Sequence, residues 1–167
     1  MLSKTGVPTK EQIEAIKPSK ERLAKGAVAI VECFQEIPCD PCYTSCKSGC
    51  ILPFANINDL PQMNFENCTG CGVCIGACPG LAIFVVDETY SDTEALLMIP
   101  WEFAPVPEEG SVVTGLSREG KEVGPVTVKK VRSSAQKNGA YILSLEVPKD
   151  LAFEIRSISL KETSSKD

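Results

Sequence analysis

The chain has 167 residues, 43% of them hydrophobic, which is enough to bury a core. Its 17 basic and 22 acidic residues give a formal net charge of −5, which argues against nucleic acid as a partner. The absence of histidine excludes a Rieske centre, haem with histidine ligands and catalysis through imidazole.

The sequence also bears on where the protein resides. No apolar run approaches the length of a membrane span, and residues 1–8 lack the hydrophobic segment of a signal peptide. The nine cysteines are an odd number, which does not suit a framework of disulfides and suits a reducing compartment. We therefore expect a cytoplasmic protein that does not bind membranes.

Two short helices are predicted at the beginning of the chain. A capping box of Thr9 and Gln12 opens a helix over residues 11–17, which ends before a proline. A second helical turn over residues 20–25 stops at Gly26, the residue type that favours the left-handed position after a helix.

Two strands flank the cysteine-rich part of the chain. Residues 27–32, which are apolar up to Glu32, lead into it, and residues 81–87 lead out of it. Both segments are rich in valine and isoleucine, so we expect them to pair as antiparallel strands.

The most informative motif lies just before the second of these strands. Its spacing is C-x2-C-x2-C-x3-C-P, formed by Cys68, Cys71, Cys74, Cys78 and Pro79. Thiols this close cannot all bridge one another without strain, but they can bind the corners of a cube. The motif is that of bacterial ferredoxins, which bind a 4Fe-4S cluster. Zinc is the weaker interpretation because its ligands usually come in pairs separated by a longer loop.

An internal repeat reveals a first run of cysteines. Residues 42–51 align with residues 74–83 without a gap. The alignment matches Cys39 with Cys71, Cys42 with Cys74 and Cys46 with Cys78, and it puts Cys33 in the place of Cys68 with three extra residues before the next cysteine. Cys50 falls opposite Ala82 and is the extra cysteine.

The two runs together resemble two-cluster ferredoxins, in which the fourth cysteine of each run binds the cluster of the other run. The resemblance implies two 4Fe-4S clusters. The first would be bound by Cys33, Cys39, Cys42 and Cys78, and the second by Cys46, Cys68, Cys71 and Cys74.

The first set leaves an alternative open. Cys33 has a non-standard spacing, so Cys50 could replace it, or the first cluster could hold three irons. The repeat favours Cys33, and Cys50 is otherwise a small buried hydrophobic residue. Lys47 also stands where the second run has a proline, which leaves the geometry and potential of the first cluster open.

Acidic residues dominate around the two runs. Between residues 33 and 86 the one basic residue is Lys47, against Glu36, Asp40, Asp59 and Glu66. Because clusters ligated by thiolates are themselves negative, this composition is expected to lower reduction potentials, unless hydrogen bonds or exposure outweigh it.

The part of the chain after residue 93 has no cysteine and is predicted to form strands. These are Leu96–Phe103, Ser111–Leu116, Val123–Val131, Ala140–Val147 and Ile155–Leu160, with a helical turn over Asp150–Glu154. The dipeptides Glu119-Gly120 and Asn138-Gly139 indicate tight turns. We expect a small closed or half-open β-barrel. It contains no nucleophile with a base, no phosphate loop and no set of metal ligands, so we expect it to dock a partner.

Two features of this barrel have competing interpretations. Trp101 and Phe103 could anchor a partner, but aromatic side chains in a small barrel more often belong to its core. Lys129, Lys130 and Arg132 form a basic run, for which a solvated strand edge is favoured over a binding patch.

The predicted fold class is α+β. A helical extension at residues 1–26 precedes a ferredoxin-like domain with two clusters at residues 27–92, and a small all-β, barrel-like docking domain follows at residues 93–167.

A second resemblance extends beyond the cysteines. Residues 18–26 and 31–42, followed by the β region, resemble the small iron-sulfur proteins that accompany flavin-dependent amino-acid and amine dehydrogenases, of the proline and hydroxyproline dehydrogenase type. In such complexes a flavin subunit removes a hydride from a C–N bond, and iron-sulfur centres pass the electrons on singly. The resemblance implies an electron-transfer subunit of a hetero-oligomer, which is not catalytic alone.

Two other functions remain open from the sequence. One is a free, diffusible ferredoxin, whose acidic surface would suit transient partners, although a carrier has no need of a second domain. The other is a structural or zinc-binding interaction module.

Overall fold

The structure is a computed structural model that describes residues 2–136 and 138–160. Its centre is one antiparallel sheet of seven strands in the order β1-β2-β3-β6-β5-β4-β7. The strands are β1 (Val28–Val31), β2 (Ile83–Asp87), β3 (Glu94–Trp101), β4 (Val112–Ser117), β5 (Glu122–Ser133), β6 (Tyr141–Pro148) and β7 (Ile155–Ser159). The helices are α1 (Leu2–Thr5), α2 (Lys10–Ile16), α3 (Lys20–Leu23), α4 (Pro41–Ser45) and α5 (Val73–Ala77), with 3-10 turns η1 (Phe65–Asn67) and η2 (Lys149–Leu151).

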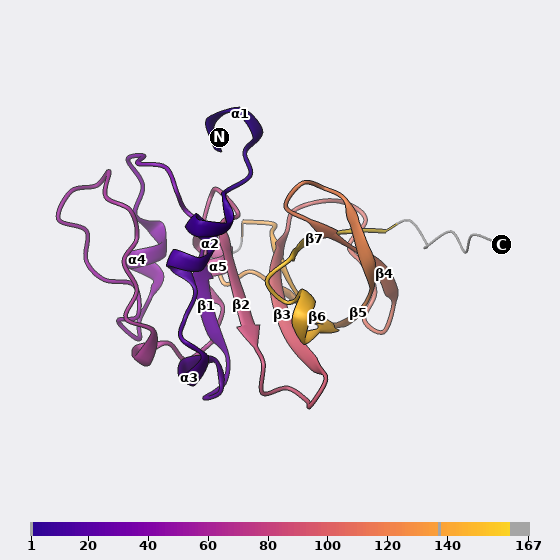
Figure 1. Ribbon diagram of the computed structural model, residues 1–167. Coiled ribbons are helices and arrows are strands. Elements are labelled where there is room, and N and C mark those ends of the chain that lie inside the picture. The colour runs from indigo at the N-terminus through magenta and orange to yellow at the C-terminus, as the bar shows by residue number, and fades with distance from the viewer. Residues whose placement is uncertain (1, 137, 161–167) are drawn as a thin grey trace.

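The mixed helix and sheet class is confirmed. Figure 1 shows β3 to β7 curling into a barrel on one side of the molecule, with β1, β2, α4 and α5 on the other. In the described part of the chain β1 and β7 are the edge strands, so the barrel is half-open. None of the described helices is long and apolar enough to cross a membrane.

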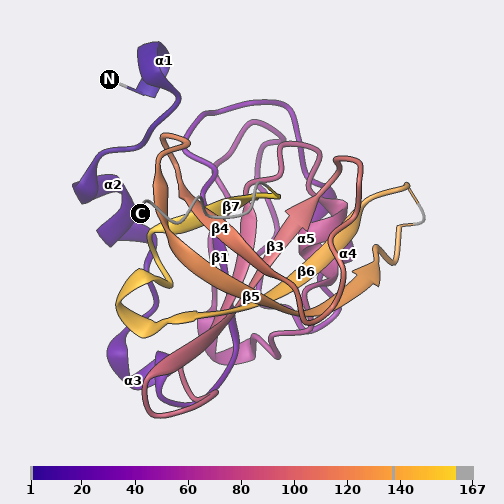
Figure 2. The same cartoon turned by 90° about the vertical axis from the view of Figure 1, so that its right-hand side faces the viewer.

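The predicted N-terminal helices are present. The Thr9 hydroxyl accepts from the Gln12 N–H, while the Gln12 side chain accepts from the Thr9 N–H, so the capping box opens α2 as expected. Helix α3 ends at Leu23, two residues earlier than predicted, because the chain turns through Gly26 at φ +124° into β1. In Figure 2 α1, α2 and α3 follow one another down one side of the molecule.

The two strands that flank the cysteines pair as predicted. β1 and β2 are antiparallel, with Val28 opposite Val86 and Val31 opposite Ile83. All four residues of β1 are buried because both faces of this strand pair are covered. Alternate residues therefore belong to different cores: Ile30 and Phe84 pack into the barrel, and Ala29, Val31 and Val85 pack against the cysteine loops.

The sheet continues across residue 93, where the sequence suggests a domain boundary. β2 pairs with β3, with Val86 opposite Leu97, and β3 pairs along its whole length with β6. The division into domains stays a prediction, but its two proposed parts share a sheet and the larger hydrophobic core.

The strands after residue 93 lie within a few residues of their predicted positions. Gly120 has φ +76° in the turn between β4 and β5, and Gly139 has φ +81° before β6. The N–H of Ala140 donates to Asn138 Oδ1 at 3.2 Å, which fixes the predicted turn locally.

The two aromatic residues of β3 and its following loop have different environments. Trp101 belongs to the barrel core, which confirms the favoured interpretation. Phe103 is 64% exposed and stacks edge-on against Trp101, with 5.2 Å between ring centroids. The core interpretation is therefore wrong for Phe103.

Candidate metal centres

A first group of cysteines lines a cavity of about 60 Å³ at the end of β1. The group consists of Cys33, Cys39, Cys42 and Cys78. Cys33 follows β1, Cys42 lies in α4, and Cys78 follows α5. The apolar part of the wall comes from Val31, Ile37, Pro61 and Ile83, and Asp59 adds a carboxyl group.

A second group lines a smaller cavity of about 20 Å³. It consists of Cys46, Cys68, Cys71 and Cys74, and the extra cysteine, Cys50, lines the same cavity. Cys46 follows α4, Cys68 follows η1, and Cys74 lies in α5. Ala29, Ile51 and Val73 supply the apolar wall.

The two groups are the sets that the cross-over assigns. Helices α4 and α5 pack against each other, so the cysteine after each helix reaches the cavity that the other run lines. Binding of a cluster by either set stays a prediction. Across residues 2–136 and 138–160, no three cysteine, aspartate or glutamate side chains converge on a point that suits a single ion.

The structure repeats in the same way as the sequence. The N–H of Ala82 donates to Cys78 Sγ at 3.4 Å, and in the first run burial opposes ionisation of Cys46 while backbone N–H groups, of Ile51 first and also of Cys50, the counterpart of Ala82, lower its pKa. Ile51, the counterpart of Ile83 in β2, forms an antiparallel bridge with Met63. Each run thus has its own short strand contact and its own N–H donor to the fourth cysteine.

Burial makes two thiols hard to ionise without a cation. It raises the pKa of Cys42 to about 11 and the pKa of Cys74 to about 12. A metal takes cysteine as the thiolate, so binding at these positions must release protons.

The surroundings of Cys68 favour the thiolate, in contrast to those of Cys42 and Cys74. The Cys50 thiol donates a hydrogen bond to it, and the N–H of Ala29 donates at 3.2 Å. These donors, together with the N–H of Gly70 and the charge of Arg22, lower the pKa of Cys68 to about 5 although burial opposes them. The same contact raises the pKa of Cys50, whose thiol is the donor.

These observations fit a 4Fe-4S cluster in each cavity. Each cavity has four sulfur donors, apolar walls and backbone N–H groups directed at sulfur, and such N–H groups are characteristic partners of cluster thiolates.

A buried charge network beside the first cavity was not predicted. Both oxygens of Glu32 accept from Arg118, at 2.9 and 2.5 Å, and Arg156 Nε donates to the same carboxylate at 2.8 Å. Arg156 also lies over the Phe84 ring, 4.7 Å from its centroid. Burial opposes ionisation of Glu32, but the hydrogen bonds and charges of the two arginines still lower its pKa.

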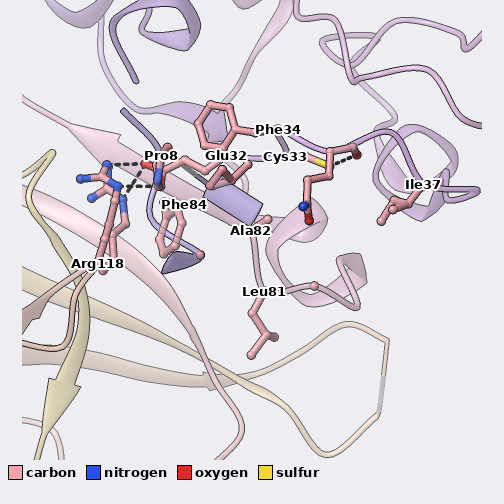
Figure 3. Close-up of a pocket in the computed structure, with 14 residues that line it drawn as sticks. Pro8, Glu32, Cys33, Phe34, Ile37, Leu81, Ala82, Phe84 and Arg118 are labelled. Atoms are coloured by element: carbon pink, nitrogen blue, oxygen red, sulfur yellow. Dashed lines mark hydrogen bonds and ion pairs between the residues drawn. The ribbon is translucent and has the colours of Figure 1, made fainter. Parts of the chain in front are cut away.

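This network closes one end of a cavity of about 420 Å³. Figure 3 shows Arg118 and Glu32 joined there, with Cys33 and Ile37 toward the other end. Glu32 precedes Cys33 directly, whereas the arginines come from the turn after β4 and from β7. The barrel therefore holds the residue next to a predicted ligand.

Two more arginines contact the backbone of the second group. Arg22 donates to the carbonyl oxygen of Cys68 at 2.8 Å, and Arg132 donates to that of Cys71 at 2.8 Å. The prediction that the basic run of β5 is a solvated strand edge is therefore wrong, because β5 lies between β6 and β4 and Arg132 contacts Cys71, although Lys129 and Lys130 are exposed.

The structure sharpens the choice between Cys33 and Cys50. Cys33 lines the first cavity, while Cys50 lies at the second cavity, which already has four other cysteines. We expect Cys50→Ala to keep the iron content of the unsubstituted chain and Cys33→Ala to lose the first cluster. Iron and sulfide analysis of the two variants, purified anaerobically, measures this. Loss of a cluster in Cys50→Ala with retention of both in Cys33→Ala would require a new ligand set.

Comparison with known proteins supports the second run directly. Residues 61–84 match the family described as "4Fe-4S binding domain". The ferredoxin-type protein NapF of Escherichia coli K12 is 35% identical over 52 residues, which cover 30% of this chain and 32% of that protein. NapF of the O6:H1 and O157:H7 strains matches equally.

The match to these relatives is partial, since the chain spans about a third of their length. No solved structure matches the chain at a significant level. The matched residues include Cys68, Cys71, Cys74 and Cys78. The chain therefore carries a ferredoxin-type domain that binds a 4Fe-4S cluster, the type of domain that transfers single electrons.

Proposed function

We propose that this chain is an electron-transfer subunit with two 4Fe-4S clusters, which passes single electrons between a flavin on a partner dehydrogenase subunit and another redox centre or acceptor. The first site is formed by Cys33, Cys39, Cys42 and Cys78, and the second by Cys46, Cys68, Cys71 and Cys74.

One observation carries the proposal: two groups of four cysteines line two cavities, and each run supplies its fourth cysteine to the other group. A 4Fe-4S cluster accepts and donates one electron at a time. Since α4 and α5 pack against each other and each bears a proposed ligand, the two sites are neighbours in one hydrophobic core. An electron can then pass through the chain without movement of the protein.

The protein residues have separate tasks in this function. The cysteine thiolates hold the clusters, and the N–H groups of Ala29 and Ala82 stabilise the negative charge on sulfur. The apolar walls, which include Val31, Ile51 and Ile83, exclude water from the cavities.

The arrangement supports clusters better than zinc. Zn–S bonds of about 2.3 Å bring four thiolates within about 4 Å of one another. Here each group of four surrounds a cavity, and the second run matches a 4Fe-4S family.

The flavin partner rests on the resemblance of residues 18–26 and 31–42 to the small iron-sulfur subunits of flavin-dependent amine and amino-acid dehydrogenases. The sequence has no histidine, and its barrel has no recognisable catalytic group, so substrate chemistry is assigned to another subunit. The chain would then be a non-catalytic member of a cytoplasmic hetero-oligomer.

A free ferredoxin is the second candidate, favoured by the net charge of −5 and by the ferredoxin-type relatives. The contacts of the barrel argue against a free ferredoxin. Arg118 of the barrel binds Glu32 beside the first run, and Arg132 binds the carbonyl of Cys71 in the second, so the barrel is more than an appended module.

One experiment separates these functions. The tagged full chain, purified anaerobically from the cells that naturally express it, is expected to contain about eight iron and eight sulfide per chain. It should also bring with it a protein that releases flavin on acid treatment, measured by fluorescence.

The control is the same chain expressed in a host without the partner, which should contain the clusters and no flavin. A chain of 18.0 kDa that keeps its clusters but brings no flavin from its own cells would point to the free carrier. Stoichiometric zinc in place of iron would contradict both functions.

A further inference from the structure

Positive charge is concentrated at the second cysteine group. Arg22 is 6% exposed and donates to four backbone carbonyls, including that of Cys68 at 2.8 Å and that of Phe65 at 2.7 Å. Within residues 2–136 and 138–160 no carboxylate lies at ion-pair distance from Arg22. Glu66 precedes Cys68 by two residues but is already paired with Lys25 at 2.7 Å, so Arg22 acts on the second site without an ion-pair partner of its own.

Arg132 brings a second cation from the barrel. Its Nη2 donates to the carbonyl of Cys71 at 2.8 Å and contacts the sulfur of Met98 at 3.7 Å. The chain at Gly72 makes room for it, because a Cβ there would collide with Arg132 Nη2. Lys47, which follows Cys46, adds a third cation. Among the described residues, Arg132 and Lys47 also have no carboxylate at ion-pair distance.

The first group faces the opposite charge. Asp59 is an exposed residue at the rim of this cavity, where one of its carboxylate oxygens accepts from the N–H of Asn56 at 2.7 Å, and Asp40 adjoins Cys39. Arg118 and Arg156 also lie near this site, but they share the carboxylate of Glu32, so the three side chains together carry one positive charge against the two negative charges of Asp59 and Asp40.

Reduction adds one negative charge to a cluster, so nearby cations raise its reduction potential and nearby carboxylates lower it. We propose that Arg22 and Arg132 make the second site the one of higher potential, so that electrons enter at the first site and leave from the second. This inference rests on the proposed function and adds the direction of transfer.

The electron balance is simple. A reduced flavin on the partner gives up its two electrons one at a time to the first site, each electron passes to the second site, and each leaves to a one-electron acceptor. No bond to the protein forms or breaks. Electrons can leave where a site is open to an acceptor. Among the nine described cysteines Cys71 is the exposed one, and it belongs to the second site.

The test is an anaerobic redox titration of the full chain, followed by electron paramagnetic resonance. The unsubstituted chain should show two one-electron couples. Arg132→Gln removes the charge but keeps an amide that can donate to Cys71, and it should shift the couple of higher potential downward and leave the other in place. Asp59→Asn should shift the couple of lower potential upward.

Two matched controls accompany these variants. Lys130→Gln removes an equal charge two residues away on an exposed side chain, and Arg132→Lys keeps the charge without the planar guanidinium. Both should leave the two potentials nearly unchanged. Iron content shows whether each variant still holds its clusters, and Asp59→Asn decides the order of potentials if Arg132→Gln fails to fold.

The outcomes are distinct. A single couple with about four iron per chain would overturn the two-cluster function and the inference with it, whereas a single couple with about eight iron would mean two clusters of equal potential and would overturn the inference alone. Two couples, with Arg132→Gln shifting the lower one or neither, or with Asp59→Asn shifting the higher one, would overturn the inference alone.

Discussion

Replacing Cys78 with alanine is expected to abolish the first cluster and to leave the second, although Cys78 belongs to the second run. The reason is the cross-over: Cys78 lines the cavity of Cys33, Cys39 and Cys42, while Cys68, Cys71 and Cys74 line the other cavity. The iron content should fall from about eight to about four per chain. Because assembly of such sites is coupled to folding, the variant should also unfold more easily.

The assignment is checked by comparing variants in pairs. The magnetic resonance spectrum of reduced Cys78→Ala should match that of Cys42→Ala, and the spectrum of Cys46→Ala should match that of Cys74→Ala. If Cys78→Ala instead resembles Cys74→Ala, each run binds its own cluster, and the grouping seen around the cavities does not reflect ligation.

Local features of the fold were predictable because they depend on residues close in sequence. The capping box at Thr9, the turn at Gly139 and the strands on both sides of the cysteines require only local patterns. The sequence repeat also has a counterpart in the structure that was not predicted, since backbone N–H groups lie at the fourth cysteine of each run, Cys46 and Cys78.

Contacts across the sheet could not be predicted in this way. Glu32 looked like the last residue of a strand, and nothing in its neighbourhood indicates that Arg118 and Arg156 surround it. A buried carboxylate needs a partner, but the sequence offers many cations and does not say which one the topology brings close. Arg132 was missed for the same reason, since its contact with Cys71 depends on how β5 lies over the second run.

The relation between the two halves of the chain was obscured by composition. The disappearance of cysteine after residue 93 suggests a new domain, yet β2 pairs with β3 without interruption. The clue lies in β2 itself. Its residues Ile83, Phe84, Val85 and Val86 are all apolar, which is typical of a strand covered on both faces. One face of β2 serves the cysteine core and the other serves the barrel core.

Glu32→Gln is expected to lower the free energy of unfolding by about 3–5 kcal/mol, the typical cost of breaking a buried ion pair by removing one partner. The side chains of Glu32, Arg118 and Arg156 are only 8%, 9% and 5% exposed, so the substitution leaves two arginines without their carboxylate and without water to replace it. Urea unfolding of the anaerobic chain, followed by circular dichroism, measures the change.

The matched control for this substitution is Glu66→Gln, which breaks the ion pair with Lys25. Those side chains are 63% and 59% exposed, so the free energy of unfolding should stay close to that of the unsubstituted chain. Neither glutamate is a proposed ligand. Both variants should therefore contain as much iron per chain as the unsubstituted chain at urea concentrations below their unfolding transition. Equal stability of the two variants would mean that Arg118 and Arg156 regain water or another partner when Glu32 is neutral. A large difference would show that the barrel stabilises the segment after β1 that carries Cys33, since the arginines that hold Glu32 come from the barrel and Glu32 precedes that cysteine.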